Sequence, residues 1–264
     1  MRRTVTASLS LTAAGPADLV LSLAVARGAH RIQEQLVVES SGAPVPVAPV
    51  EARHGTHVLR VTVGPGRVDI RYHATVEGRD PAPPVVASDL LEYLRPSRYA
   101  EADKLTAFAA DQFGALERFE LLDAVVEWVG SRVAYVPGSS GPTDGAIDTL
   151  LTRRGVCRDF AHLVIGILRA RAVPARLVAV YAPGLSPMDF HAVVEACIDD
   201  TWYVVDATRL APRGTLLRIA TGRDAADTAF LSSYGAEVTL DQIEVTATSD
   251  GNLPWDDGTP HILG

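Results

Sequence analysis

Apolar and polar residues alternate through most of the first 80 residues of the chain. Val5, Ala7 and Leu9 alternate with threonines and serines at the start, and residues 31–40 hold a further strand-like run. A period of two residues is typical of strands that bury one face. The segment 61–72 contains a Gly-Pro-Gly turn between two such runs, which predicts a β-hairpin.

Short strands separated by glycine and proline turns, with no helical period, predict a small β-sandwich over residues 1–85. The sequence Asp-Pro-Ala-Pro-Pro follows at residues 80–84. Prolines cannot donate ladder hydrogen bonds, so this segment is predicted to be a stiff linker. We place a domain boundary near residue 85.

Beyond the linker the apolar residues recur at helical spacing. This period predicts two amphipathic helices, over residues 115–133 and 156–170. The first is marked by Leu116, Phe119, Leu122, Val126 and Val129, and the second by Phe160, Leu163, Val164, Ile167 and Leu168.

Strand-like runs return after Pro174. They cover residues 176–181, 191–198 and 202–207. Helices followed by strands favour an α+β fold, with helices packed on an antiparallel sheet, over residues 86–215. Residues 216–264 have a weak, polar periodicity, and we interpret them as a C-terminal extension that packs on this core.

Charge and composition exclude some partners. The chain has 264 residues and a formal net charge of -8. Nucleic-acid binding draws its affinity from clustered Lys and Arg, so we expect no nucleic-acid partner. No stretch approaches the roughly 20 apolar residues of a membrane span, so we expect no membrane partner either. The first residues, Met-Arg-Arg and then alternating positions, favour a strand over a signal peptide.

The 2 cysteines, Cys157 and Cys197, lie in different settings. They give neither a disulfide framework nor a metal-ligand cluster, so we expect no metal and no cofactor. A reducing compartment fits this usage best, and we predict a cytoplasmic protein.

Cys157 lies in the first turn of the second predicted helix. Unpaired N–H groups and the helix dipole favour an anion there, as a cysteine nucleophile requires. Gly155 would leave room for a substrate carbonyl near the backbone. The alternative is a small buried apolar cysteine.

A second candidate is the hairpin that contains His191 and Asp206. The strand from His191 turns at Asp199-Asp200 and returns to Asp206. In a hairpin with an even-numbered loop, positions that differ by an odd number face the same side, which makes these two direct or diagonal neighbours. Asp206 could then hold the imidazole of His191 in one tautomer and stabilise its charged form. The alternative is a strand-end histidine beside an unrelated aspartate.

Three other features are weaker candidates. Cys197 lies in a strand without a helix terminus and is interpreted as structural. His162 is poorly spaced from Cys157 on one helix and is interpreted as a packed or capping residue. The loop 137–142 is glycine-rich but lacks the Gly-Lys-Ser/Thr ending of a phosphate loop, so it is either a surface loop or a rim of the cleft.

Three separated motifs resemble the bacterial transglutaminase-like superfamily. They are Gly-Val-Cys157-Arg-Asp-Phe-Ala-His, Asp-Phe-His191-Ala-Val-Val-Glu-Ala and Trp-Tyr-Val-Val-Asp206-Ala-Thr-Arg. The resemblance covers about residues 97–213, and the upstream region resembles the N-terminal domain that often precedes this core. It implies a papain-like core with a Cys157-His191-Asp206 triad that forms a thioester acyl-enzyme.

The resemblance leaves the acyl acceptor open. It implies first a hydrolase acting on a peptide, a protein or a small amide, and alternatively an acyltransferase that uses an amine. A binding module with an idle triad is the third reading. Animal transglutaminases carry Trp where this chain has Arg158, and no Asp-rich calcium loop is present, which disfavours calcium-dependent crosslinking. The backbone N–H of Cys157 is the expected first oxyanion donor, and Tyr135 is a candidate for the second.

Overall fold

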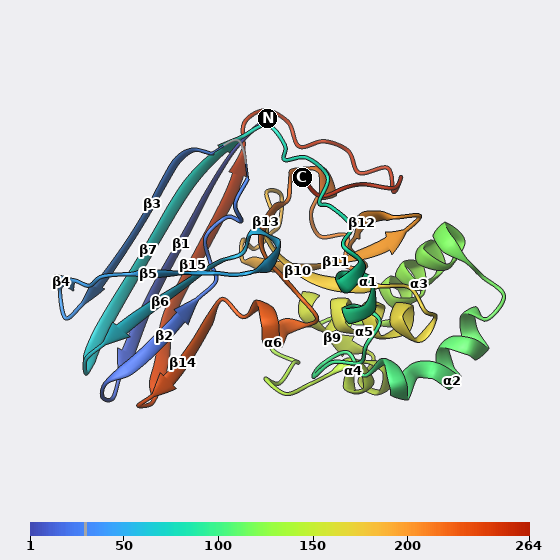
Figure 1. Ribbon diagram of the computed structural model, residues 1–264, viewed down its shortest axis with the longest axis horizontal. Coiled ribbons are helices and arrows are strands. Elements are labelled where there is room, and N and C mark those ends of the chain that lie inside the picture. The colour runs from blue at the N-terminus through green and yellow to red at the C-terminus, as the bar shows by residue number, and fades with distance from the viewer. Residues whose placement is uncertain (29–30) are drawn as a thin grey trace.

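The computed structural model describes residues 1–28 and 31–264 (Figure 1). A β-sandwich lies to the left in Figure 1, and a sheet covered by helices lies to the right. One sheet of the sandwich has the order β15-β1-β7-β3-β4 and the other β14-β2-β6-β5. The strands are β1 (Arg2–Ala13), β2 (Ala17–Leu21), β3 (Arg31–Ser40), β4 (Ala43–Pro44), β5 (Ala48–Glu51), β6 (His57–Val63), β7 (Gly66–Glu77), β14 (Leu231–Gly235) and β15 (Val238–Ser249).

The sandwich core follows from the alternation in the sequence. Along β1 and β7 every second side chain is buried, because successive side chains of a strand point to opposite faces. Leu9, Leu19, Val61 and Ile70, two from each sheet, are each exposed by 1% or less. Their burial confirms the predicted N-terminal sandwich.

The predicted hairpin within residues 61–72 is wrong. β6 and β7 are consecutive strands, but β6 pairs with β2 and β5 while β7 pairs with β1 and β3. The turn between them therefore crosses from one sheet to the other. Alternation of apolar residues identifies each strand, but it does not identify the partner with which the strand pairs.

Two strands of the C-terminal region differ from the prediction for residues 216–264. β14 pairs with β2, and β15 pairs along nearly the whole of β1, so both belong to the sandwich instead of packing on the core. β15 is an edge strand, and most of its side chains are exposed. An edge strand with one sparsely covered face has little need for apolar residues, which explains its weak pattern.

The second part of the chain has the predicted α+β fold. Its sheet has the order β12-β11-β10-β13, and all its pairs are antiparallel. Helix α5 (Cys157–Ala170) packs against this sheet and buries nearly all of its side chains. The strands are β10 (Ala175–Tyr181), β11 (Phe190–Ile198), β12 (Thr201–Val205) and β13 (Leu217–Gly222), and the short parallel pair is β8 (Ala134–Tyr135) and β9 (Arg154–Gly155).

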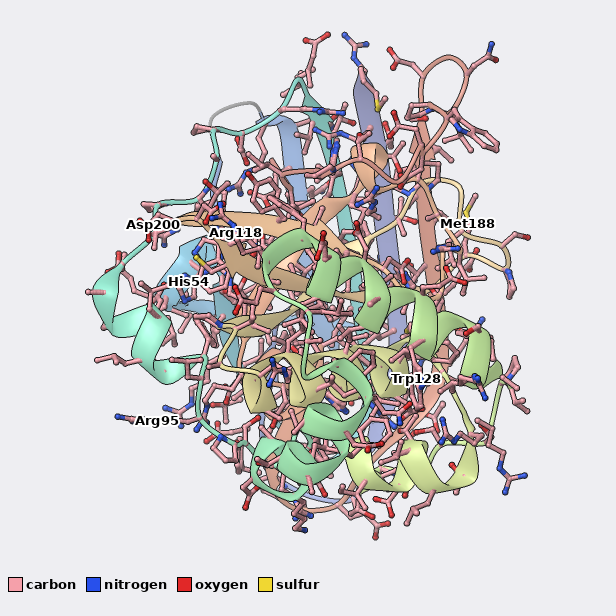
Figure 2. All side chains as sticks on the ribbon, turned by 90° about the vertical axis from the view of Figure 1, so that its right-hand side faces the viewer. His54, Arg95, Arg118, Trp128, Met188 and Asp200 are labelled. Carbon is pink, nitrogen blue, oxygen red and sulfur yellow. The ribbon has the colours of Figure 1, made fainter. Side chains whose placement is uncertain are left out.

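The helices cover one side of this sheet. The predicted helices correspond to α3 (Arg118–Arg132) and α5 (Cys157–Ala170). Figure 2 shows Arg118, at the start of α3, beside the turn of the β11–β12 hairpin, where it pairs with Asp199. Helices that the periodicity did not predict are α1 (Ala87–Glu92), α2 (Ala102–Phe113), α4 (Ala146–Thr152) and α6 (Ala225–Thr228). Across the described residues, no helix is both long and apolar enough to span a membrane.

The two parts share a packed boundary. β13 pairs with β10 of the core sheet, yet its Leu217 and Ile219 are buried in the sandwich core. Tyr181 of β10 donates a hydrogen bond to the carbonyl of Leu23, at 2.7 Å. The boundary near residue 85 stays a prediction, but a cut there would remove the pairing partners of β14 and β15.

Candidate active site

Cys157 is the first residue of α5 and is half-buried. The helix begins there because Val156 is extended and donates its N–H to Asp159 Oδ2, at 2.7 Å. This contact satisfies one of the N–H groups that a helix leaves unpaired at its start. Gly155 is explained by the same carboxylate: a Cβ at this position would lie 2.6 Å from Cβ of Asp159. Gly155 is therefore explained by the close approach of the capping residue Asp159, and not by the room for a substrate carbonyl that the sequence suggested.

His191 and Asp206 are brought together by the β11–β12 hairpin. Val194 pairs with Val205, so Asp206, just past the strand end, is a diagonal neighbour of His191. Nε2 of His191 lies 2.7 Å from Oδ2 of Asp206, and both side chains are almost fully buried. The turn residues Asp199 and Asp200 both have left-handed φ angles, as the predicted two-residue loop requires.

The second oxygen of Asp206 is held by Thr208. Its backbone N–H donates to Oδ1 at 2.9 Å, and its hydroxyl donates to the same atom at 2.6 Å. Burial would raise the pKa of Asp206, but the charge of His191 and these hydrogen bonds lower it. We did not predict the contribution of Thr208 from the sequence. The sequence signal that could have indicated this role is a hydroxyl residue two positions after an aspartate at the end of a strand.

The surroundings of His191 favour its charged imidazolium form. Burial would lower its pKa, but the charge and hydrogen bond of Asp206, together with the nearby Cys157, raise it to about 10. The other ring nitrogen, Nδ1, is buried, and besides Asp206 the side chain of Cys157 is the group that acts on the ring through a hydrogen bond and its charge. Since Nε2 is taken by Asp206, Nδ1 is the nitrogen available to the thiol of Cys157.

Tyr135 of β8 lies beside Cys157. The backbone N–H of Cys157 approaches its phenol oxygen, and burial and the charge of the thiol raise the pKa of Tyr135 to about 12. The phenol therefore keeps its proton at neutral pH and remains a hydrogen-bond donor. This position agrees with the candidate role of Tyr135 near the oxyanion, which stays a prediction.

The glycine-rich loop 137–142 is tied to the start of α5. Arg158 donates to Ser140 Oγ at 2.6 Å and to the carbonyl of Gly141 at 2.9 Å. Ser140 in turn donates to Oδ1 of Asp159 at 2.8 Å. The loop is therefore anchored beside the nucleophile position, as expected for a rim of the cleft. Arg158, which replaces the Trp of animal transglutaminases, is the anchor.

Cys197 and His162, two of the three weaker candidates, lie away from the site formed by Cys157, His191 and Asp206. Cys197 is buried with Tyr93 and Trp202, and burial raises its pKa. His162 is fully buried, accepts the N–H of Ala225 at 3.2 Å, and burial lowers its pKa to about 3. Both positions agree with the structural interpretation.

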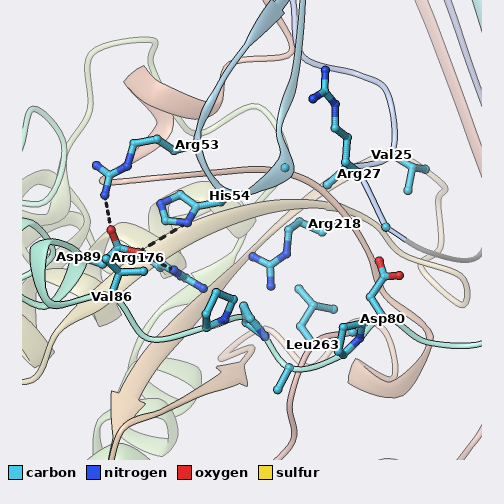
Figure 3. A pocket seen from close by; sticks show the side chains of 18 of the residues that line it. Val25, Arg27, Arg53, His54, Asp80, Val86, Asp89, Arg176, Arg218 and Leu263 are labelled. Carbon is cyan, nitrogen blue, oxygen red and sulfur yellow. Dashed lines mark hydrogen bonds and ion pairs between the residues drawn. The ribbon is translucent and has the colours of Figure 1, made fainter.

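A cavity of about 610 Å³ lies where the sandwich, the linker and the core sheet meet (Figure 3). Arg176 and Arg218 line it and both bind the buried Glu195, and Arg176 stacks on Trp202 with 3.9 Å between the guanidinium carbon and the ring centre. Figure 3 shows His54 and Arg176 converging on Asp89. This ionic cluster joins the two halves of the protein, and the triad residues do not line the cavity.

Comparisons with known proteins agree with this geometry. The sequence model of the transglutaminase-like superfamily matches residues 106–207, which contain Cys157, His191 and Asp206. The uncharacterised protein ML0607 of Mycobacterium leprae is 27% identical over 151 residues, which are 52% of this chain and 53% of that protein. The matched segment thus spans about half the length of this curated relative.

A solved structure gives a match over nearly the full length. A protein from Cytophaga hutchinsonii, described as a putative cysteine protease, is 32% identical. The superposition covers 98% of this chain and 95% of that chain, with a TM-score of 0.89. Sandwich and core are therefore shared with this relative. The chain belongs to the transglutaminase-like superfamily.

Proposed function

We propose that the protein is a cysteine-dependent amide-bond hydrolase that works through a thioester on Cys157. One arrangement carries the proposal. Cys157 lies in the first turn of α5 and its side chain interacts with the imidazole of His191, whose Nε2 is held by Asp206 at 2.7 Å. This order of nucleophile, base and orienting acid is the arrangement that acyl transfer needs.

Acylation begins with attack of the Cys157 thiolate on the carbonyl carbon of an amide. A C–S bond forms and the carbonyl oxygen becomes an oxyanion. When the intermediate collapses, the C–N bond breaks and Nδ1–H of His191 gives its proton to the leaving nitrogen. The amine departs, and a thioester and a neutral imidazole remain.

Deacylation restores the starting state. Water gives a proton to Nδ1 of His191 and attacks the thioester carbonyl, a C–O bond forms, and the C–S bond breaks with Cys157 leaving as thiolate. Asp206 stabilises the imidazolium at both ends of the cycle. The raised pKa of His191, about 10, supports a resting imidazolium, which is the form that acylation requires.

The oxyanion of this cycle has two candidate donors. The backbone N–H of Cys157 lies at a helix start, and the phenol of Tyr135 lies beside it with its proton retained. A substrate carbonyl oxygen bound between them would replace the direct contact between the N–H of Cys157 and the phenol oxygen of Tyr135.

Trapping the acyl-enzyme tests the proposal. The protein is incubated with p-nitrophenyl acetate, quenched in acid and digested, and the acetylated peptide is identified by mass spectrometry. We expect the acetyl group on Cys157, none on Cys197, and slower acetylation in His191→Ala. Acetylation that is absent, or that persists in Cys157→Ala, would leave the idle binding module as the better reading. Acid as product indicates hydrolysis, and amide formed with added amine indicates transfer.

A further inference from the structure

The larger sheets of this protein end in edge strands, and several of these edges are protected against further pairing. An edge strand presents unpaired N–H and C=O groups, which proteins commonly block with proline, charge or a bulge. The edge strands β4 and β5 contain Pro44 and Pro49. The edge strand β15 carries Asp241 and Glu244, and its register with β1 shifts at Asp241. These three edges of the sandwich are therefore poor templates for another strand.

Both edges of the core sheet are covered by other parts of the chain. On β12, the N–H of Val204 donates to the carbonyl of His261 at 2.8 Å, and its carbonyl accepts from Arg213 at 3.1 Å. On β13, the carbonyl of Arg218 accepts the N–H of Ala26 at 2.8 Å. Neither edge is therefore open along its whole length.

The remaining edge strand of the sandwich, β14, has none of these protections. Its sequence is Leu-Ser-Ser-Tyr-Gly, without charge or proline, and its register with β2 is regular. In Figure 1 it runs from α6 along the lower margin of the sandwich. Tyr234 on this strand is 64% exposed, and exposed tyrosines are enriched where proteins meet. β14 is therefore the open edge of the sandwich.

The hydrogen bonds to β2 determine which backbone groups of β14 are free. The N–H of Ser22 donates to the carbonyl of Phe230 at 3.0 Å, and the N–H of Ala236 donates to the carbonyl of Pro16 at 3.1 Å. In an antiparallel ladder such pairs recur at every second residue. The even-numbered residues of β14 therefore bond to β2, and the odd-numbered residues present their N–H and C=O groups to the outside.

The sequence of β14 is complementary to itself in an antiparallel arrangement. A two-fold axis at Ser233 places this residue opposite its own copy, as a pair that exchanges two backbone hydrogen bonds. The same axis places Leu231 opposite Gly235 of a second copy. On the other face of the strand, Tyr234 lies over Ser232 of the second copy, whose small side chain leaves room for the ring.

Charge does not oppose this contact, although the chain has a formal net charge of -8. Asp18 is the acid opposite Tyr234 on β2. It is paired with Arg60 at 2.6 Å and accepts the hydroxyl of Thr62 at 2.6 Å. Exposed charges farther away than about 8 Å are largely screened at physiological salt. The open edge therefore meets its copy without an unpaired like charge beside it.

We propose that β14 is the docking edge for a second copy of this chain, and that the two β14 strands pair antiparallel with Ser233 on the two-fold axis. The pairing joins two four-stranded sheets into one. It involves five residues a side, against about 20–30 in a standard interface, so we expect a weak dimer with a Kd of about 10–100 µM. The inference does not depend on the chemistry of Cys157.

Sedimentation velocity between about 5 and 500 µM measures the Kd of this dimer. Ser233→Pro should raise the Kd about tenfold or more, because each copy loses a hydrogen bond. The N–H of Ser233 points away from β2, so a proline is tolerated there. Tyr234→Ser should raise the Kd about tenfold, because it removes the ring from both halves of the contact. Trp255→Ser, which removes a 90% exposed aromatic residue outside the sandwich strands, is the matched control and should leave the Kd unchanged.

Disulfide trapping tests the register of the pair. The two copies of Ser233 are expected about 5.5 Å apart between Cα atoms, which is within disulfide range. The two copies of Ser232 are expected about 8 Å apart, which is beyond that range. The Ser233→Cys variant, with Cys157→Ala to remove the reactive thiol, should form a cross-linked dimer with diamide, which takes up the hydrogen of each thiol. Ser232→Cys in the same background should form about tenfold less.

Three results would overturn the inference. The protein remains monomeric throughout the concentration range, or it forms a dimer whose Kd is unchanged in Ser233→Pro, or Ser232→Cys cross-links as well as Ser233→Cys. Disulfide trapping decides the question if Ser233→Pro fails to fold.

Discussion

His191 and Asp206 lie diagonally across the β11–β12 hairpin with their side chains 2.7 Å apart and almost fully buried. A carboxylate that has lost its water at this distance interacts strongly with an imidazolium. The pair therefore defines which nitrogen of His191 is free.

Asp206→Asn should lower turnover of any thioester-forming substrate by about a hundredfold or more, because an amide can hold His191 in the wrong tautomer and leaves the imidazolium without a counter-charge. Asp200→Asn is the matched control, since Asn tolerates the left-handed φ of that turn position. Steady-state kinetics of both variants gives the test. Equal losses would mean that Asp206 has only a structural role.

Thr208→Val should lower turnover by roughly ten- to a hundredfold, because a hydrogen bond to a charged group contributes about 1.5–3 kcal/mol. The hydroxyl lowers the pKa of Asp206, so its removal should also move the acid limb of the pH–rate profile to higher pH. Thr208→Ser keeps the donor and should restore both properties. A loss of turnover with an unmoved acid limb would argue against Thr208 as a positioning residue.

The stability of the fold should depend on pH through the same pair. The pKa of His191 is raised to about 10, so its contribution is fully present below its unfolded value of about 6.5 and disappears as the pH rises through 10. The pKa of Asp206 is lowered, so its contribution is lost as the pH falls below about 4. The Tm of the wild type should exceed that of Asp206→Asn most between about pH 5 and 6.5. A Tm difference that stays constant up to pH 10 would contradict this account.

Arg158→Ala should release the loop 137–142 from the start of α5, because it removes both hydrogen bonds of the guanidinium. We expect KM to rise about three- to tenfold with a smaller change in kcat, and limited proteolysis within the loop to accelerate. Arg154→Ala, an exposed arginine of β9, is the control. Unchanged proteolysis in Arg158→Ala would show that the loop is held by other contacts.

Much of the site could be predicted because its elements have strong local patterns. α5 buries nearly a whole helix surface, and β11 and β12 are rich in β-branched residues around a two-residue turn. Because the residue numbers 191 and 206 differ by an odd amount across this turn, both side chains face the same side of the hairpin. The start of the helix, the hairpin and the shared side of its two residues all depend only on short segments of the sequence.

Features that depend on distant partners could not be predicted in this way. β15 pairs with β1 across nearly the whole chain, and nothing in the polar sequence of residues 238–249 identifies that partner. The turn after β6 looks like a hairpin turn, yet it connects two sheets. Thr208 and Arg158 act through contacts that only the folded loops create.

The proposed mechanism requires that one thiol is activated by its place at a helix start beside His191. Peptide-resolved labelling with iodoacetamide against time at pH 6 measures this directly. Cys157 should be alkylated well before Cys197, whose pKa is raised by burial. His191→Ala should slow the labelling of Cys157, because it removes the cation that stabilises the thiolate, and Asp206→Asn should slow it less. Comparable rates at both cysteines, unchanged in His191→Ala, would contradict the triad.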